Sequence, residues 1–187
     1  MAIRKMKAGF SLIELMVVIS IIAILGSIIA LNVFRAIEKA KIARAVADMK
    51  AIKTASLAFY IDVGTFPLTS LNQTAYLQSS GLVSNTTGSP SWNGPYLEKV
   101  PIIHPWNSMY LLGAWNMGRG AAGDYTLKLL NSCYPGGAEQ SCEIPLASIV
   151  KIDQFIDDGN LGGGDLLGAV GGGGGNIWWM MSWDCCS

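Results

Sequence analysis

The chain has 187 residues, of which 51% are hydrophobic and 14% are charged, and its formal net charge is zero. This length suffices for one domain and an anchoring segment, and the balanced charge gives no reason to expect a nucleic-acid partner. The charges are unevenly distributed, because basic residues dominate residues 35–53 and acidic residues dominate from Asp124 onward. The basic and acidic segments could attract each other between subunits that stack in an assembly. Two separate solvated faces explain the pattern equally well.

The N-terminus combines a short basic leader with a long apolar run. Residues 1–9 carry three positive charges and no acidic residue, and residues 15–31 carry no charge at all. A helix over residues 10–33 would be about 36 Å long, enough to cross a hydrocarbon core of about 30 Å. The leader is expected to stay cytoplasmic while the rest of the chain is exported. A secretory signal peptide has a shorter apolar core than this run.

A single acidic residue, Glu14, lies at the start of the apolar run. A carboxylate in the middle of a membrane costs about 2.5–3.5 kcal/mol and is normally paired or functional. A plain signal anchor does not explain it, unless the side chain lies at the interface and reaches water. The sequence therefore presents Glu14 as a candidate functional residue.

The junction between the leader and the run resembles a known processing signature. Residues 7–19, Lys-Ala-Gly-Phe-Ser-Leu-Ile-Glu-Leu-Met-Val-Val-Ile, are similar to the class III signature of type IV prepilins and type II secretion pseudopilins. The resemblance implies that a prepilin peptidase cleaves after Gly9 and methylates the new N-terminus at Phe10. It also implies that Glu14 neutralises the N-terminal amine of a neighbouring subunit, which suits two charges that are each costly in an apolar medium.

The apolar run continues into an amphipathic helix. Within residues 36–60, a stripe recurs every three or four positions: Ile42, Val46, Met49, Ile52, Ser56 and Phe59. This spacing is typical of a helix with one buried face. Residues 28–61 contain no Gly or Pro, and Gly64 and Pro67 predict the helix end. The sequence thus predicts one helix of about fifty residues.

Three motifs after this helix resemble turns of the major pseudopilins. They are Tyr-Ile-Asp-Val-Gly-Thr-Phe-Pro at residues 60–67, Gly-Pro-Tyr-Leu-Glu-Lys-Val-Pro at 94–101 and His-Pro-Trp-Asn-Ser-Met-Tyr at 104–110. His104 stands where these relatives usually have Asp, and Asn107 stands where they have Gly. The resemblance covers roughly residues 1–112.

The remaining pattern predicts a small sheet. Strands are predicted over residues 109–115 and 124–130, and a short helix over residues 145–155. An antiparallel sheet laid against a long helix is an α+β fold. Glycines at 162–164 and 171–175 indicate flexible connections. Three tryptophans in the tail are expected to fold back onto the sheet as core, in preference to forming a sticky tip.

One acidic segment has the chemistry of a calcium site. Its candidate ligands are Asp153, Asp157, Asp158, Asn160 and Asp165. Calcium prefers several hard oxygen ligands on a backbone that can wrap around it, although the spacing is not that of an EF-hand. The resemblance points the same way, since major pseudopilins hold calcium in an acidic glycine-rich loop near the C-terminus. A polar helix cap and turn explains the same residues equally well.

Four cysteines lie beyond the apolar run: Cys133, Cys142, Cys185 and Cys186. An even number beyond a membrane anchor fits disulfides in an oxidising compartment, and the absence of a C-x-x-C pair argues against zinc. Cys133 and Cys142 bracket a turn-rich loop, so we expect a disulfide to close it. Cys185 and Cys186 then pair with each other or with a second subunit.

These features predict a structural subunit and not an enzyme. The sequence has one His, no Gly-x-Ser-x-Gly motif and no phosphate-binding loop. The predicted organisation is a leader at residues 1–9, a membrane and filament-core helix at 10–34, and an amphipathic helix with a globular head and extended tail at 35–187.

The resemblance implies a single-pass precursor in a bacterial inner membrane, with its head periplasmic or extracellular. An inner-membrane assembly platform would add it to identical or related subunits. A pseudopilus for type II secretion is the first interpretation. A surface type IV pilin for adhesion, motility or DNA uptake is the second, favoured by the extra tail and the cysteines. A membrane-anchored extracytoplasmic binding or enzymatic domain is the third.

Overall fold

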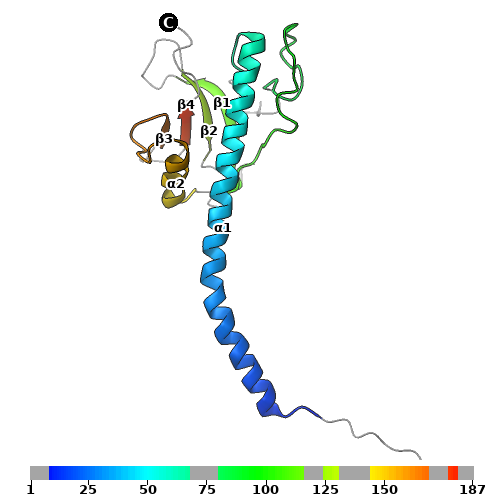
Figure 1. Ribbon diagram of the computed structural model, residues 1–187, viewed down its shortest axis with the longest axis vertical. Helices are drawn as coiled ribbons and strands as arrows, with labels where there is room; N and C mark the ends of the chain where they lie inside the picture. The colour runs from blue at the N-terminus through cyan, green and yellow to red at the C-terminus, as the bar shows by residue number, and fades with distance from the viewer. Residues whose placement is uncertain (1–8, 68–79, 116–123, 131–143, 169–176, 181–187) are drawn as a thin grey trace, which may run out of the picture. The chain divides into compact units, whose positions relative to one another are not determined.

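The computed structural model describes residues 9–67, 80–115, 124–130, 144–168 and 177–180. In chain order the elements are α1 (Leu12–Val63), β1 (Tyr110–Trp115), β2 (Asp124–Leu129), α2 (Leu146–Ile156), β3 (Leu166–Gly168) and β4 (Ile177–Met180) (Figure 1). A long N-terminal helix followed by a small antiparallel sheet confirms the predicted α+β class. The chain divides into a first unit, residues 1–40, and a second unit, residues 41–187, and α1 contributes to both.

The predicted long helix is present, with 52 residues. It ends where the sequence indicates, because Gly64 adopts a φ of +81° and its N–H donates to the carbonyl oxygen of Tyr60 at 2.8 Å. This left-handed conformation closes the last turn and is accessible to glycine at little cost.

In the second unit, one face of α1 forms the centre of the core. Its buried residues recur at helical spacing: Ile42, Ala45, Met49, Ile52, Ala55, Ser56 and Phe59. This stripe matches the predicted one, except that Val46 is only partly buried. Burying each large apolar side chain stabilises the fold by about 1.5–3 kcal/mol.

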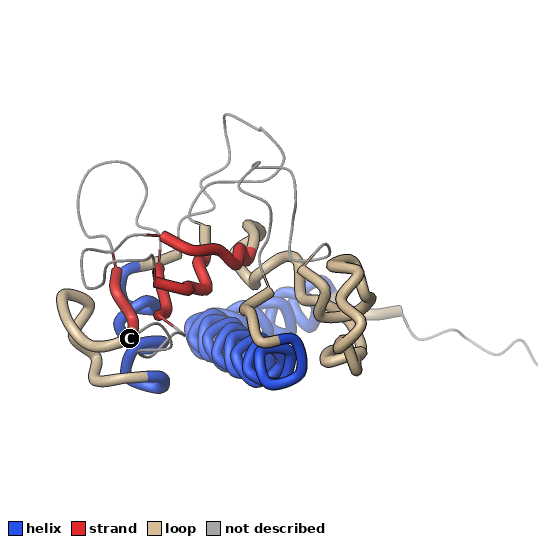
Figure 2. The backbone as a smooth tube through the Cα atoms, turned by 90° about the horizontal axis from the view of Figure 1, so that it is seen from above, coloured by secondary structure: helices blue, strands red, loops and turns tan. Residues whose placement is uncertain are grey.

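The sheet supplies the other side of this core. Its strand order is β1-β2-β4-β3, and all neighbours are antiparallel. Leu112 pairs with Leu127, Leu127 pairs with Trp179, and Trp179 pairs with Leu166, so these four side chains share one face of the sheet. All four are buried. Figure 2 shows the strands on one side of α1.

Strands β3 and β4 were not predicted from the sequence. β4 lies between β2 and β3, and Trp179 is only 4% exposed, so this tail tryptophan is core as expected. Trp178 lies on the opposite face of β4, where the Nζ of Lys128 is 4.1 Å from its ring centre. Trp183 and the four cysteines lie outside the described residues, so the expected disulfides stay predictions.

The motifs that follow α1 tie the adjoining loop to the end of the helix. Phe66 stacks on Tyr60 with ring centres 4.6 Å apart, and on Tyr125 of β2 with ring centres 4.4 Å apart. The hydroxyl of Tyr96 donates to Asp62 Oδ2 at 2.8 Å. These contacts fix the end of α1 to the sheet and to the loop ahead of β1.

The third motif forms a turn around a buried histidine. His104 Nδ1 accepts a hydrogen bond from the Trp106 N–H at 3.2 Å, and Nε2 lies 2.7 Å from the carbonyl oxygen of Leu130. Since a carbonyl only accepts and an amide N–H only donates, the ring must be neutral with its proton on Nε2. Burial also lowers the pKa of His104. Asn107 has a φ of +62°, at the position where the major pseudopilins have Gly.

Candidate functional site

The predicted processing site lies immediately ahead of α1. Phe10 is 88% exposed, and no described atom lies within 4 Å of the place where a Cβ on Gly9 would be. Nothing in the described chain therefore requires a glycine at position 9.

Glu14 caps its own helix. It is the third residue of α1, and its Oε2 accepts a hydrogen bond from the Ser11 N–H at 2.9 Å. Ser11 immediately precedes the helix, so Ser11-Leu-Ile-Glu14 has the spacing of a capping box. The carboxylate also lies at the positive end of the helix dipole. This cap was not predicted, although the Ser-x-x-Glu spacing is visible in the sequence.

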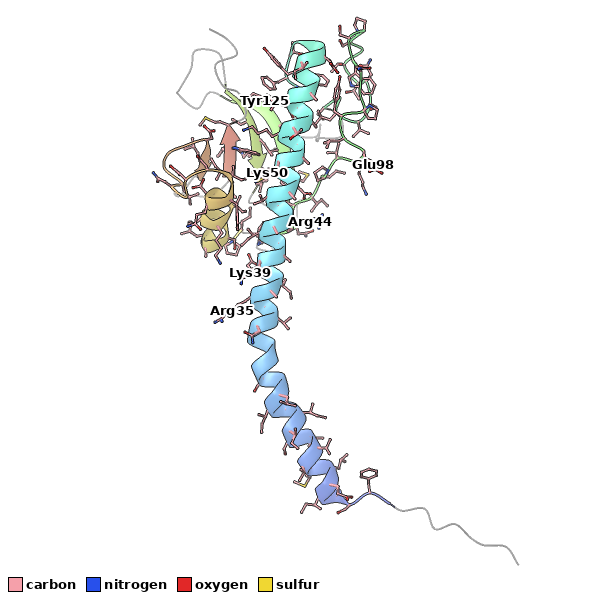
Figure 3. The ribbon with its side chains drawn as sticks, viewed as in Figure 1. Arg35, Lys39, Arg44, Lys50, Glu98 and Tyr125 are labelled. Carbon is pink, nitrogen blue, oxygen red and sulfur yellow. The ribbon has the colours of Figure 1, made fainter. Side chains whose placement is uncertain are left out.

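The first unit exposes apolar side chains on every side of α1. Each large apolar side chain from Leu12 to Leu25 is 49–76% exposed. Within the described residues, α1 is the one helix long and apolar enough to cross a membrane. Arg35 and Lys39 follow the run four residues apart, and both point to the same side of α1 (Figure 3). A helix that is apolar all round needs lipid or other helices around it.

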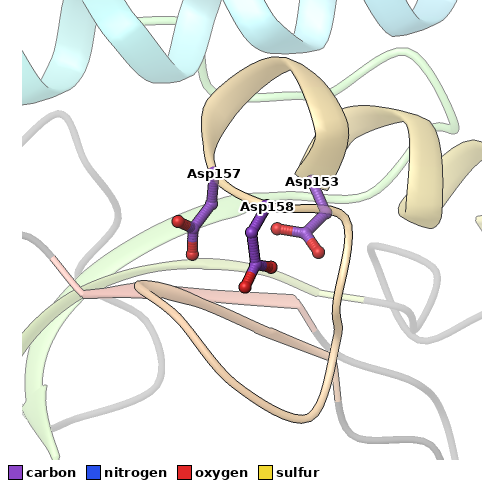
Figure 4. A group of neighbouring side chains, drawn as sticks. All are labelled: Asp153, Asp157 and Asp158. Atoms are coloured by element: carbon purple, nitrogen blue, oxygen red, sulfur yellow. The ribbon is translucent and has the colours of Figure 1, made fainter.

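A second candidate site lies at the end of α2, in the second unit. Asp153 belongs to the last turn of α2, and Asp157 and Asp158 follow the helix end (Figure 4). Carboxylate oxygens of these three residues lie within 4.8 Å of one another. Two oxygens bound to the same calcium ion lie at most about 5 Å apart, given Ca–O distances of about 2.3–2.6 Å. The three carboxylates are therefore close enough to bind one ion.

Asp153 is the unusual member of this group. It is 0% exposed, and neither of its carboxylate oxygens has a hydrogen-bond partner among the described residues. Burial, helped by the charges of Asp157 and Asp158, raises the pKa of Asp153 to about 6. An unpartnered carboxylate in this position is costly. A bound cation would satisfy it, so the group can hold a metal ion.

The neighbouring loop is built around Asp157. The Oδ2 of Asp157 accepts hydrogen bonds from the backbone N–H groups of Asp165 and Leu166, the latter at 3.2 Å. Gly164 has a φ of +71°, and a Cβ there would collide with the Asp157 carboxylate. The glycine thus allows the backbone to approach this carboxylate closely.

The other two candidate ligands, Asn160 and Asp165, are not part of the group of three carboxylates. The Asn160 N–H donates to Asp158 Oδ1 at 2.7 Å, and Asn160 Oδ1 accepts from the Gly162 N–H at 3.2 Å. These are the bonds of a polar turn, which supports the cap-and-turn interpretation for Asp158 and Asn160. Asp165 is not a member of the converging group. The cap-and-turn interpretation leaves Asp153 unexplained.

Comparisons with known proteins match two family models to this chain. Residues 4–30 match the family described as prokaryotic N-terminal methylation motif, and residues 36–119 match the family described as PilW, C-terminal.

Three similar proteins are each called type II secretion system core protein G. The protein from Pseudomonas aeruginosa is 32% identical over 146 residues, which cover 75% of this chain and 95% of that protein. The protein from Aeromonas hydrophila is 32% identical over 111 residues, 57% of this chain and 73% of that protein. The protein from Escherichia coli K12 is 31% identical over 104 residues, 56% of this chain and 70% of that protein.

Proposed function

The chain belongs to the family of type II secretion system core protein G, the pseudopilins, and we propose that it is a structural subunit of a type II secretion pseudopilus. The observation that carries this proposal is the 32% identity over 95% of the Pseudomonas aeruginosa protein. The exposed apolar half of α1 supports it, because such a helix suits the core of a filament. A surface type IV pilin is less well supported, since the three similar proteins are all named for secretion.

We propose that maturation and assembly use three residues at the start of the chain. Prepilin peptidase cleaves between Gly9 and Phe10 and methylates the new amine. The precursor is anchored in the inner membrane by residues 10–34, with residues 35–187 outside the cytoplasm. Arg35 and Lys39 then lie at the level of the lipid headgroups, where basic side chains are favoured. On assembly, Glu14 pairs with the Phe10 amine of a neighbouring identical or related subunit delivered by the assembly platform.

The chain is proposed to have no catalytic activity of its own. His104, the single histidine of the sequence, is buried, and its ring nitrogens bond the Trp106 N–H and the Leu130 carbonyl oxygen. Its two ring nitrogens are therefore committed to backbone groups and unavailable to a Ser/His or Cys/His mechanism.

The proposed function has a direct test in the native host. Deleting the gene should stop secretion, and a plasmid copy of the full chain should restore it together with sheared filaments that contain this protein. Normal secretion in the deletion strain, with the protein found only as a membrane monomer, would reject the pseudopilus proposal.

We also propose that Asp153, Asp157 and Asp158 bind calcium. The ion would supply positive charge to the buried carboxylate of Asp153 and link the end of α2 to the loop that follows. Asn160 and Asp165 shape that loop. Calcium at 100 times its dissociation constant would stabilise the folded chain by about 2.7 kcal/mol.

The substitution Asp153→Asn tests the calcium site through the melting temperature of the chain, measured in a buffer with chelator and in a buffer with calcium. A raised pKa means that the ionised carboxylate opposes folding at pH 7, and that this cost grows as the pH rises from about 4 and is complete above about 6. In chelator at pH 7, Asp153→Asn should therefore raise the melting temperature of the full-length chain in detergent, while abolishing the further rise with calcium. Asp62→Asn is the control, since its amide oxygen can still accept from Tyr96. Equal melting of the wild-type chain in calcium and in chelator would reject the site.

A further inference from the structure

Lys53 on α1 lies beside the acidic loop. Its Nζ is 4.6 Å from the ring centre of Trp179. Trp179 pairs with Leu166 across β3 and β4, and the Met180 N–H donates to the carbonyl oxygen of Asp165 at 2.8 Å. The register therefore places the backbone of Asp165 opposite Met180, one residue from Trp179, on whose indole the ammonium lies. Burial lowers the pKa of Lys53, and the carboxylates of Asp165 and Asp157 act in the opposite direction by attracting its charge.

Asp157 belongs to two charged arrangements at once. It is one of the three carboxylates that converge with Asp153, and its Oδ2 also receives the N–H groups of Asp165 and Leu166. A divalent ion and the Lys53 ammonium would thus act on the same carboxylate from different elements. Two cations that act on one carboxylate repel each other.

We propose that Lys53 is the resident counter-cation of the acidic loop: it holds the loop on α1 when calcium is absent, and its charge lowers the affinity of the loop for calcium. Lys53 is a positioning residue here, because it acts through Asp157 and Asp165 and does not bind the ion. This inference rests on the proposed calcium site.

The test is a calcium titration of the full-length chain in detergent, followed by melting temperature. Lys53→Met keeps the aliphatic chain over Trp179 and removes the charge. It should lower the melting temperature in chelator and reduce the half-saturating calcium concentration about tenfold, because a nearby unit charge is removed from a divalent ion's site. Lys53→Gln is the second variant should the first fail to fold, and Lys53→Arg should behave like the wild type.

Lys128→Met is the matched control. Lys128 also lies over a β4 tryptophan, Trp178, but on the opposite face of the strand. Its loss should leave the calcium midpoint unchanged. A calcium response in the wild type with the same midpoint, within twofold, in Lys53→Met and Lys53→Gln would overturn the inference and leave the calcium site standing. No calcium response in the wild type would overturn both.

Discussion

The cap that Glu14 provides to its own helix allows two roles of this residue to be separated. In the single chain its carboxylate accepts the Ser11 N–H at 2.9 Å. In a filament it is proposed to pair with the amine of a neighbouring subunit. Glu14→Ala removes both the cap and the charge. Glu14→Gln removes the charge but keeps an amide oxygen that can accept the same N–H.

Losing the cap and losing the charge pair differ in their cost in free energy. Losing a helix cap typically costs about 1 kcal/mol. Leaving the partner amine unpaired in an apolar filament core costs about 3–5 kcal/mol at every subunit contact. Both variants should enter the membrane at least as well as the wild type, because a costly charge has gone. Both should fail to form filaments, whereas fraying of the first turn of α1 should occur only in Glu14→Ala.

Three measurements on each variant decide the matter: membrane fractionation, electron microscopy of sheared filaments, and hydrogen exchange of the amides in the first turn of α1. Wild-type numbers of filaments from Glu14→Gln, with none from Glu14→Ala, would show that Glu14 acts through the cap. Normal filaments from both variants would show that neither role is needed for assembly, and the proposed pairing would be rejected.

The remaining predictions concern processing, disulfides and pH. Gly9→Val should block cleavage without changing the stability of the chain, because the Cβ of the valine would lie in open space. An intact mass that shows a mature N-terminus at Phe10 in this variant would contradict the prediction. Cys133 and Cys142 should form one disulfide, and non-reducing peptide mapping that links either to the tail cysteines would contradict it. The lowered pKa of His104 means that its neutral form stabilises the fold fully above about pH 6.5, and that this contribution is lost as the pH falls below that value. His104→Gln should therefore show a smaller fall in melting temperature between pH 7 and pH 5 than the wild type; an unchanged fall would mean that the buried ring does not titrate.

Much of the fold is visible in the sequence because one helix dominates it. The helical repeat identifies the face of α1 that is buried, and Gly64 ends the helix as its position predicts. β1 and β2 were also predicted within one residue of their observed bounds. Local pattern suffices for α1, which shows a helical repeat, and for β2, whose apolar residues alternate, whereas β1 is an apolar run.

The elements that sequence reasoning missed depend on tertiary pairing. β3 has three residues, too few to show an alternation of apolar and polar side chains. β4 reads Ile-Trp-Trp-Met, an apolar run without period two, and it becomes a strand because β2 and β3 pair with it on either side. The same holds for Asp153: its position at the end of a helix is predictable, whereas its complete burial depends on how α2 packs.

The exposed apolar half of α1 cannot by itself decide how subunits assemble. A helix in lipid is already removed from water, so transferring it into a filament core gains little from the hydrophobic effect. Its large apolar side chains from Leu12 to Leu25 are chemically alike on all sides and set neither register nor orientation. Glu14 is the single charged residue in this part of the helix. Only a positive charge at one position along the filament axis can pair with it. The register of a filament built from this chain should therefore depend on one carboxylate more than on the apolar surface around it.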